Sequence, residues 1–282
     1  MTKVSIIIPC YNQCEFIAET INSVKKQRFK DYEIIIINDG STEKGAVQFL
    51  NKFTDVDTKV LHIENTGVSA ARNYAIKHGN GEYILPLDAD DCIDELFLHE
   101  TVAILDAMPE IEAVRTGVKY FGAINHEEIL PIYSRRRHLL QNLFFNTTLF
   151  RKTSFLNVGG YDEQFLIGWE DWDLFLRLIE NEEQVFAIDR PYYFYRIKLS
   201  SRNANLQEEK KQKAEQQLYK KHLETYLQYF PEPLSLLREL DFLQAEKAAF
   251  EQVKKSIYQS ATYRLGHIML SPVKMIKHFL GI

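Results

Sequence analysis

Acidic residues at residues 88–91 (Asp-Ala-Asp-Asp) stand directly after a short apolar run. Carboxylates at Asp88 and Asp90 could hold a hard divalent cation, since such ions prefer oxygen ligands. A bound diphosphate would supply further oxygens, and the ion would neutralise charge developing on that group as it departs. The alternative is a polar turn whose aspartates cap a helix beginning near Asp94. The spacing alone leaves both interpretations open.

A second acidic pair lies in residues 168–173 (Gly-Trp-Glu-Asp-Trp-Asp), where the chain's two tryptophans, Trp169 and Trp172, bracket Glu170 and Asp171. Apolar rings pack on the C–H face of a sugar, and desolvation tunes the pKa of a carboxylate that acts as a general base. The alternative is a helix start, where the macrodipole favours carboxylates. We favour the interpretation as an acceptor site with a base.

Polar residues also follow an earlier apolar run, at residues 38–41 (Asn-Asp-Gly-Ser). Asp39 could accept hydrogen bonds from a base or a ribose, and Gly40 permits a tight turn. An ordinary strand-to-helix turn with Ser41 as the helix cap is the favoured interpretation if these residues are taken alone.

Two further side chains are candidates for ligand contact. Tyr11, which follows Pro9, could stack on a base, although an aromatic residue at a strand end is also typical of a core. Arg72 follows the small residues 69–71, which would let a ligand approach. The alternative for Arg72 is a surface salt bridge.

The expected elements bring these groups to one edge of a sheet. Strands are predicted at the apolar runs 4–8, 34–37, 60–63 and 83–87, with helical patterns between them. This alternation is typical of βαβ units and predicts an α/β fold with a mostly parallel, Rossmann-like sheet flanked by helices. The β-branched run 34–37 predicts a central strand. Ligands bind beyond the carboxyl ends of such strands, where residues 9–12, 38–41 and 88–91 all fall.

The rest of the chain is less regular. Residues 113–121, 146–150 and 192–197 are strand candidates, and residues 170–179 form a helical pattern. From residue 206 onward, charged stretches with apolar residues at helical spacing predict helices separated near Pro231 and Pro233. We therefore expect a catalytic domain over residues 1–205 and a helical C-terminal region over residues 206–282.

Composition excludes several classes of protein. The 282 residues are 45% hydrophobic and 26% charged, as in an ordinary globular protein, and the net charge of −5 argues against a general nucleic-acid binder. Three cysteines without metal-site spacing indicate a reducing compartment. Neither a signal peptide nor a long uncharged apolar window is present, so a cytoplasmic location is expected.

The last residues form a basic segment with an apolar face. Leu265, Met269, Val273 and Ile276 recur at helical spacing over residues 265–280. Such a helix suits the cytoplasmic face of an anionic membrane, which it is too short and too charged to cross. The alternative is that this face packs on the catalytic domain or on a partner subunit. We favour peripheral membrane contact.

Six motifs taken together identify a family. Over residues 3–200 the sequence resembles the nucleotide-sugar-dependent glycosyltransferase family 2, which has the GT-A fold. The motifs, in chain order, are residues 5–12 (Ser-Ile-Ile-Ile-Pro-Cys-Tyr-Asn), 38–41, 65–73 (Asn-Thr-Gly-Val-Ser-Ala-Ala-Arg-Asn), 87–91, 159–163 (Gly-Gly-Tyr-Asp-Glu) and 169–174. Their order makes a chance match very improbable, because each alone is a weak signal.

The resemblance implies a role for each matching position. The positions that surround the donor's base, commonly uracil, are Pro9, Tyr11, Asp39 and Arg72. Asp88 matches a position near the ribose and diphosphate, and Asp90 matches the ligand of a Mn²⁺ or Mg²⁺ ion. Asp171 matches the base that deprotonates the acceptor hydroxyl during an inverting displacement. Trp169, Glu170 and Trp172 would then border the acceptor.

One position departs from the family pattern. Many members have a histidine after the last strand that contributes to the metal or diphosphate site, whereas Lys198 stands there in this chain. A protonated lysine is not a metal ligand, but it can contact a phosphate as a point charge.

The expected function is inverting, metal-dependent transfer of a sugar from a nucleoside diphosphate donor, UDP in particular, to a hydroxyl of a glycan or lipid-linked acceptor in cell-surface polysaccharide synthesis. A nucleotidyltransferase or an aspartate-dependent phosphatase fits the motif order less well. A catalytically silent scaffold subunit is the remaining alternative. The basic run 135–138 (Arg-Arg-Arg-His) is interpreted as a solvated loop rather than an acceptor contact. A homo-oligomer is left open.

Overall fold

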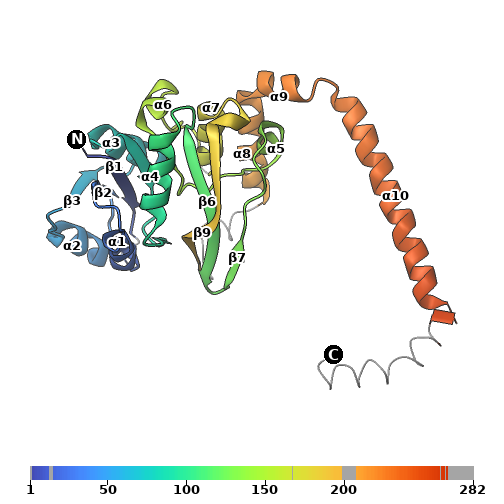
Figure 1. Cartoon of the computed structure of the whole chain (residues 1–282), viewed down its shortest axis with the longest axis horizontal. Coiled ribbons are helices and arrows are strands. Elements are labelled where there is room, and N and C mark those ends of the chain that lie inside the picture. The colour runs from blue at the N-terminus through green and yellow to red at the C-terminus, as the bar shows by residue number, and fades with distance from the viewer. Residues whose placement is uncertain are drawn as a thin grey trace. The chain divides into compact units, whose positions relative to one another are not determined.

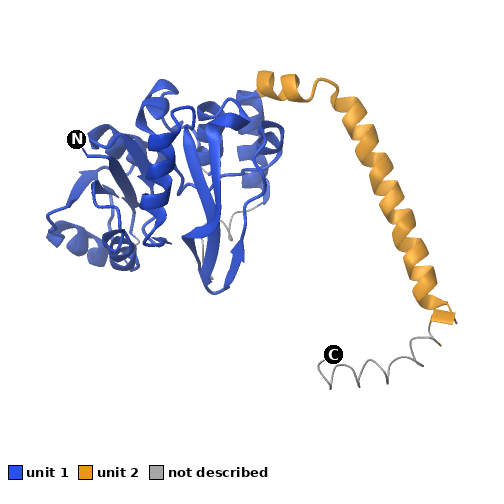
Figure 2. Cartoon of the chain, in the orientation of Figure 1, with its two compact units in different colours: residues 1–222 blue, residues 223–282 orange. Residues whose placement is uncertain are grey.

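The computed structural model describes residues 2–12, 15–166, 168–198, 208–260, 262–263 and 265. The chain divides into two compact units, Met1–His222 and Leu223–Ile282 (Figure 2). Residues 265–280, for which the sequence predicts an amphipathic helix, lie outside the described residues apart from Leu265. Among the residues that are described, no helix is both long enough and apolar enough to span a membrane.

The parallel half of the sheet has the strand order β3-β2-β1-β4 (Figure 1). The strands are β1 (Val4–Cys10), β2 (Tyr32–Asp39), β3 (Thr58–Ile63) and β4 (Tyr83–Pro86). Isoleucines fill both faces of β2, because successive side chains of a strand point in opposite directions. Ile34 and Ile36 belong to one core cluster, and Ile35 and Ile37 belong to the other. The predicted α/β fold with a buried β-branched strand is confirmed.

Helices cover both faces of this half. α1 (Ile17–Lys25) and α4 (Phe97–Ala107) share the core cluster of Ile34, whereas α3 (Val68–His78) packs through Ala71 and Ala75 into the cluster of Ile35. The small side chains of α3 let that helix lie close to the sheet. The remaining helix of this half is α2 (Lys44–Lys52).

The second half of the sheet is mixed and continues in the order β4-β8-β6-β9-β5. Its strands are β5 (Cys92–Ile93), β6 (Ala113–Gly122), β8 (Leu149–Arg151) and β9 (Val185–Ile197), with β7 (His126–Glu128) paired to β6. β8 runs antiparallel to both of its neighbours, and β9 runs parallel to β6 and antiparallel to β5. The β9–β5 pairing brings the end of β9 beside the turn that follows β4.

Among its described residues, the first unit also contains α5 (Arg135–Leu140), α6 (Lys152–Asn157), α7 (Glu170–Leu178) and α8 (Glu208–Lys221), with a 3-10 turn at Glu182–Gln184. α7 packs through Leu174 and Phe175 into the core. The sequence pattern groups α8 with the C-terminal region, but α8 lies within the first compact unit. His222, directly after α8, contacts Asp173 of α7 with 2.9 Å between Nε2 and Oδ1.

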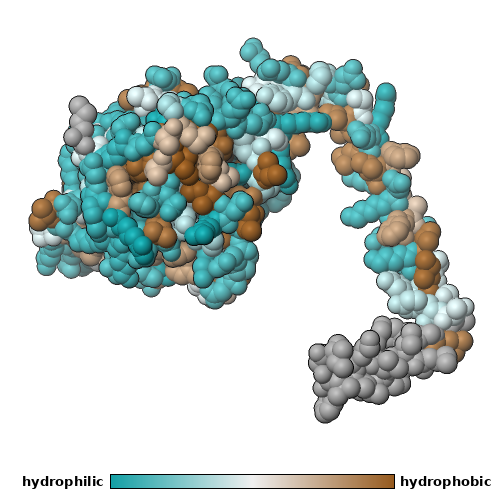
Figure 3. Space-filling view, in the orientation of Figure 1, coloured by the Kyte–Doolittle hydropathy of each residue, from teal (hydrophilic) through white to brown (hydrophobic). Residues whose placement is uncertain are grey.

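The second unit contains α9 (Leu223–Tyr229) and α10 (Pro233–Gln259). Pro233 stands at the first turn of α10, where its missing N–H is tolerated. Exposed apolar side chains, Leu237 and Phe250 among them, are spread along α10 between hydrophilic ones (Figure 3).

Candidate active site

Asp39, the last residue of β2, supports the turn between β3 and α3. Its carboxylate oxygens accept hydrogen bonds from the backbone N–H groups of Thr66, at 2.8 Å, and Gly67, at 3.0 Å. Gly40 adopts φ +67°, and a Cβ there would lie 2.5 Å from the backbone nitrogen of Asn65. Only glycine therefore fits at position 40, between the turn after β2 and the turn before α3. Asp39 is buried at the expected strand end, where its carboxylate supports the turn before α3.

Asn12, rather than Ser41, binds the backbone just before α2, which has no side-chain cap of its own. The Asn12 side-chain oxygen accepts hydrogen bonds from the backbone N–H groups of Thr42, at 2.7 Å, and Glu43, at 3.0 Å. Ser41 Oγ instead accepts from the backbone N–H of Asn12 at 3.0 Å. Asparagine tolerates the left-handed conformation that Asn12 adopts, with φ 56°. Sequence reasoning missed this contact because Asn12 and Thr42 are 30 residues apart in the chain.

Tyr11 is 48% exposed, so its ring is open to a stacking partner rather than part of the core. Pro9, at the end of β1, is half-buried and lies in register with Ile37 of β2. These two residues border the carboxyl ends of β1 and β2, as the sequence predicted.

Arg72 joins the two acidic segments. Its guanidinium lies 2.7 Å from Asp88 Oδ1 and 3.0 Å from Glu170 Oε1, and above the ring of Tyr161. The arginine is 3% exposed, so the surface salt bridge considered from the sequence is wrong. Burial opposes its charge, but Asp88 and Glu170 outweigh that effect and raise the pKa of Arg72. The buried ion pairs bring the strand-end turn and the start of α7 together.

The aspartates of residues 88–91 do not cap α4. The backbone N–H of Leu96, at the helix start, donates instead to Asp94 Oδ1 at 2.9 Å. Asp91 instead is buried and accepts from Tyr193 Oη and from the backbone N–H of Arg196, both on β9. Burial, with the nearby carboxylates of the same turn, raises the pKa of Asp91 well above its usual range. The hydrogen bonds of Asp91 therefore hold the turn of residues 88–91 against β9.

Asp88 and Asp90 each have a cationic partner. Arg72 contacts Asp88, and the ammonium of Lys198 forms an ion pair with Asp90 Oδ2. Over the described residues, no group of three histidine, cysteine, aspartate or glutamate side chains is arranged to hold a metal ion. These protein groups therefore do not make a divalent-cation site by themselves, since Mn²⁺ and Mg²⁺ need several oxygen or nitrogen ligands.

Asp171 lies in the first turn of α7 and is half-buried. The amide of Asn142 donates to its Oδ2 at 3.0 Å, and the backbone N–H of Trp172 donates to its Oδ1 at 2.8 Å. Burial and the adjacent carboxylate of Glu170 raise the pKa of Asp171 to about 7. A carboxyl with this pKa can accept a proton near neutral pH.

The two tryptophans of this segment differ. Trp172 is buried, and its indole N–H donates to the carbonyl of His138 at 2.7 Å, so the structure places it in the interior rather than on an acceptor surface. Trp169 is half-buried and adopts φ 65°, which is strained for a residue with a side chain. Glu170 is buried against Arg72. Trp169 is thus the aromatic residue of the pair that remains accessible.

Residues 135–138 form α5 rather than a solvated loop. Arg135 is buried and donates to the carbonyl of Ile179, while Arg136 and Arg137 are exposed. Burial, with the nearby Arg135 charge, lowers the pKa of His138 to about 3, which keeps this ring neutral. Arg135 and His138 of the basic run therefore lie in the interior of the first unit.

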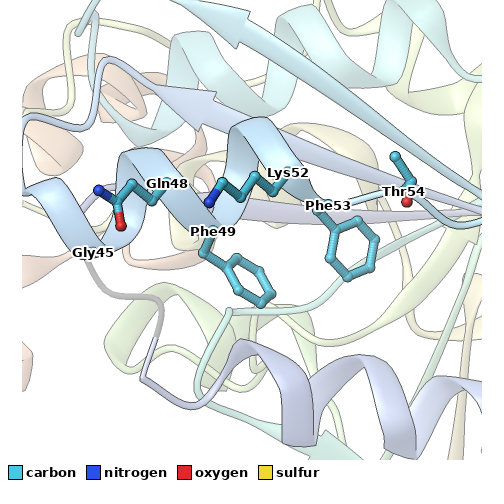
Figure 4. A pocket seen from close by; sticks show the side chains of 6 residues that line it. All are labelled: Gly45, Gln48, Phe49, Lys52, Phe53 and Thr54. Carbon is cyan, nitrogen blue, oxygen red and sulfur yellow. The ribbon is translucent and has the colours of Figure 1, made fainter.

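A hollow along α2 lies apart from these residues. Its lining comprises Gly45, Gln48, Phe49, Lys52, Phe53 and Thr54 (Figure 4). Figure 4 shows these side chains along one helix and the loop that follows it. None of the residues predicted to bind a ligand lines it.

Comparison with known proteins decides the family, since residues 5–160, more than half of the chain, match the family described as Glycosyl transferase family 2. The chain belongs to glycosyltransferase family 2. Residues 122–221 also match the description Glycosyltransferase like family 2. The curated relative GlyA of Streptococcus pneumoniae, a glycosyltransferase, is 24% identical over 71% of this family 2 chain and 31% of its own length. The chain spans less than a third of the length of several curated relatives, GlyA included.

Solved structures share the fold. Staphylococcus aureus TarS 1–349 in complex with UDP-GlcNAc matches with a TM-score of 0.62 and 22% identity over 73% of this chain and 61% of that chain. A mannosyltransferase from Pyrobaculum calidifontis in complex with GDP-Man and Mn²⁺ matches with a TM-score of 0.55 and 19% identity over 95% and 84% of the two chains. The family 2 chain has the GT-A type of fold, as its motifs imply.

Proposed function

We propose that this family 2 protein is an inverting glycosyltransferase that moves a sugar from a UDP-sugar to a hydroxyl of a glycan or lipid-linked acceptor in cell-surface polysaccharide synthesis. One observation carries the proposal: buried Arg72 ties Asp88, on the donor side, to Glu170, beside Asp171. A transferase of this kind needs both substrates within one reaction distance.

The arrangement supports a single displacement. The Asp171 carboxylate takes the proton of the acceptor hydroxyl while the acceptor oxygen attacks the anomeric carbon. The bond from that carbon to the β-phosphate oxygen breaks, and its electron pair leaves with the nucleoside diphosphate. Attack from the face opposite the leaving group inverts the anomeric configuration. The raised pKa of Asp171 supports its assignment as the base.

The donor is assigned to the strand ends. The exposed ring of Tyr11 is available to stack on uracil, and Pro9, Asp39 and Arg72 are assigned to positions around the base. Asp88, which pairs with Arg72, is assigned to the ribose and diphosphate. The UDP-GlcNAc that TarS holds in its structure supports a uridine nucleotide on this fold. Trp169 is the ring proposed to lie against the acceptor.

A positive charge beside Asp90 would stabilise the departing diphosphate. The hypothesis from the sequence assigns that charge to Mn²⁺ or Mg²⁺ bound at Asp90, and the Mn²⁺ in the Pyrobaculum mannosyltransferase supports a metal on this fold. The pairing of Asp90 with Lys198 limits what the protein itself offers such an ion.

Release of UDP from a panel of UDP-sugars, measured with and without candidate acceptors, tests the function. Wild-type protein should turn over at least one donor. Asp171→Asn should bind UDP normally but transfer at least about a hundredfold more slowly, because an amide cannot accept the proton. Glu95→Gln, which changes an exposed carboxylate paired with Arg28, is the matched control and should keep full activity. A protein that binds UDP and releases none from any donor would be the silent scaffold.

A further inference from the structure

Lys198 places a positive charge beside Asp90, where the proposed reaction needs a cation for the departing diphosphate. It directly follows β9, and its ammonium forms an ion pair with Asp90 at the carboxyl end of the parallel strands. The Lys198 and Asp90 side chains are 24% and 21% exposed, so the pair is partly shielded yet reachable from solvent. Ion pairs in such places are screened less than those on an open surface.

The strand holds Lys198 in this place. Arg196, two residues earlier, donates from its backbone N–H to Asp91 Oδ1 at 2.8 Å and from Nε to the carbonyl of Asp90 at 2.7 Å. The ring of Phe16 lies near both cations, with its centroid 4.2 Å from the Arg196 guanidinium carbon and 5.9 Å from Lys198 Nζ. These contacts fix the turn to β9 and place the ammonium before any ligand arrives.

We propose, on the basis of the function proposed above, that Lys198 supplies the positive charge for the donor's diphosphate in place of a divalent cation. A metal ion bound to Asp90 would lie against the ammonium, and like charges at that distance repel strongly. An ammonium carries three N–H donors, so Lys198 can hold Asp90 and contact phosphate oxygens together. Asp90 is then a positioning residue for Lys198.

The ammonium would act during bond cleavage. As the bond between the anomeric carbon and the β-phosphate oxygen breaks, negative charge builds on the diphosphate, and Lys198 stabilises that charge while keeping its proton. A cation fixed by the protein does not need to be recruited from solution. Donor binding and transfer should therefore continue in a chelator.

Calorimetric titration of UDP and of uridine into the 282-residue chain, in EDTA and in Mn²⁺, tests the inference. The UDP Kd of wild type should change less than about threefold between the two conditions. Lys198→Met should weaken UDP binding at least about tenfold and leave uridine binding unchanged, because only the diphosphate contact is removed. Lys198→Arg should keep most of the wild-type UDP affinity. Lys198→His should reach the wild-type UDP affinity only when Mn²⁺ is present.

The matched control is Lys119→Met, which removes a half-exposed lysine paired with Glu127 and should bind UDP as wild type does. Circular dichroism of each variant checks that it is folded. Wild-type UDP binding that disappears in EDTA, together with unchanged UDP binding by Lys198→Met, would overturn the inference and leave the proposed function standing. Absence of nucleotide binding and of donor turnover under every condition would overturn both.

Discussion

At the scale of single residues, Asp171 is held in a setting suited to proton transfer. It is half-buried at the first turn of α7, with Glu170 beside it and the Asn142 amide on one oxygen. Burial and Glu170 disfavour the charged carboxylate, whereas the amide favours it. The balance leaves the pKa of Asp171 near the working pH of a general base.

This balance predicts the pH dependence of transfer. Because the pKa of Asp171 is raised to about 7, the carboxyl is protonated below that pH and cannot act as a base. The rate should therefore fall about tenfold per pH unit as pH drops below 7 and level off above it. Initial rates between pH 5 and 9 at saturating donor would measure this profile, and a flat profile down to pH 5 would contradict the assignment.

Asn142→Leu should move that profile. Losing the amide removes a hydrogen bond to the charged form, so the pKa of Asp171 rises further and the rise in rate shifts to higher pH. The exposed amide of Asn80 offers a control, Asn80→Leu, whose profile should match wild type. A drop in rate with no shift of the profile would mean that Asn142 has only a structural role.

The sequence predicted some site residues better than others. The segments containing Asp39, Arg72 and Asp88 follow buried strands or small residues, and their positions at the sheet edge could be read from that pattern. Trp172 could not be told from Trp169 in the sequence, because Trp169 directly precedes α7, Trp172 lies in its first turn, and only packing decides which ring is buried. Asn142 carries no local signal, since its contact with Asp171 depends on the tertiary fold.

At the scale of elements, the carboxylate of Asp173 on α7 binds the end of α8. Asp173 is fully buried and contacts Arg177, Lys221 and His222. Burial works against its ionisation, but hydrogen bonds from His222 and the charges around it lower the pKa of Asp173 to about 2. This carboxylate holds the last helix of the first unit.

Asp173→Asn should destabilise the first unit by about 3–5 kcal/mol, because its cationic partners would be left without their carboxylate. Since the folded pKa is depressed, the wild-type contribution should be present above about pH 4 and be lost as pH falls toward 2. Urea unfolding at pH 7 and pH 3 measures both effects. Lys213→Met, which removes a surface ion pair with Glu209 on α8, is the control and should cost about 1 kcal/mol or less.

The strands were predicted unequally for a physical reason. β1, β2, β3 and β4 are apolar runs between turn residues, which a sequence shows directly. β5 has two residues and β7 has three, too few for a periodic pattern. β9 begins at Val185, earlier than the predicted 192, because its first part carries Asp189 and Arg190 and does not look apolar.

At the scale of the whole molecule, the position of α8 bears on where the catalytic unit ends. The sequence pattern places a boundary at residue 205, whereas the first compact unit runs through His222. A chain truncated after His222 should keep the α7–α8 contacts, a cooperative melting transition and UDP binding. A chain truncated after residue 205 should melt at a lower temperature and lose UDP affinity. Thermal melts and UDP titrations of both truncations would measure the difference.

The basic C-terminal segment is proposed to bind the cytoplasmic face of an anionic membrane. Truncation after Ser260 should abolish sedimentation with vesicles containing anionic lipid and leave release of UDP from the donor unchanged. Neutral vesicles provide the control. An unchanged vesicle-bound fraction would contradict the proposal, and unfolding of the truncated chain would favour packing of this segment on protein.

The ion pairs of Arg72 with Asp88 and Glu170 also bear on when a chain under synthesis acquires a complete site. Arg72 and Glu170 are 98 residues apart in sequence and share a buried hydrogen bond of 3.0 Å. A chain on the ribosome that has emerged only through β8 holds the complete set of donor-side strands but lacks the carboxylate that completes the arginine's pairing. On the proposed function, such a nascent chain should release no UDP from a UDP-sugar, and turnover should begin only once Glu170 has folded against Arg72.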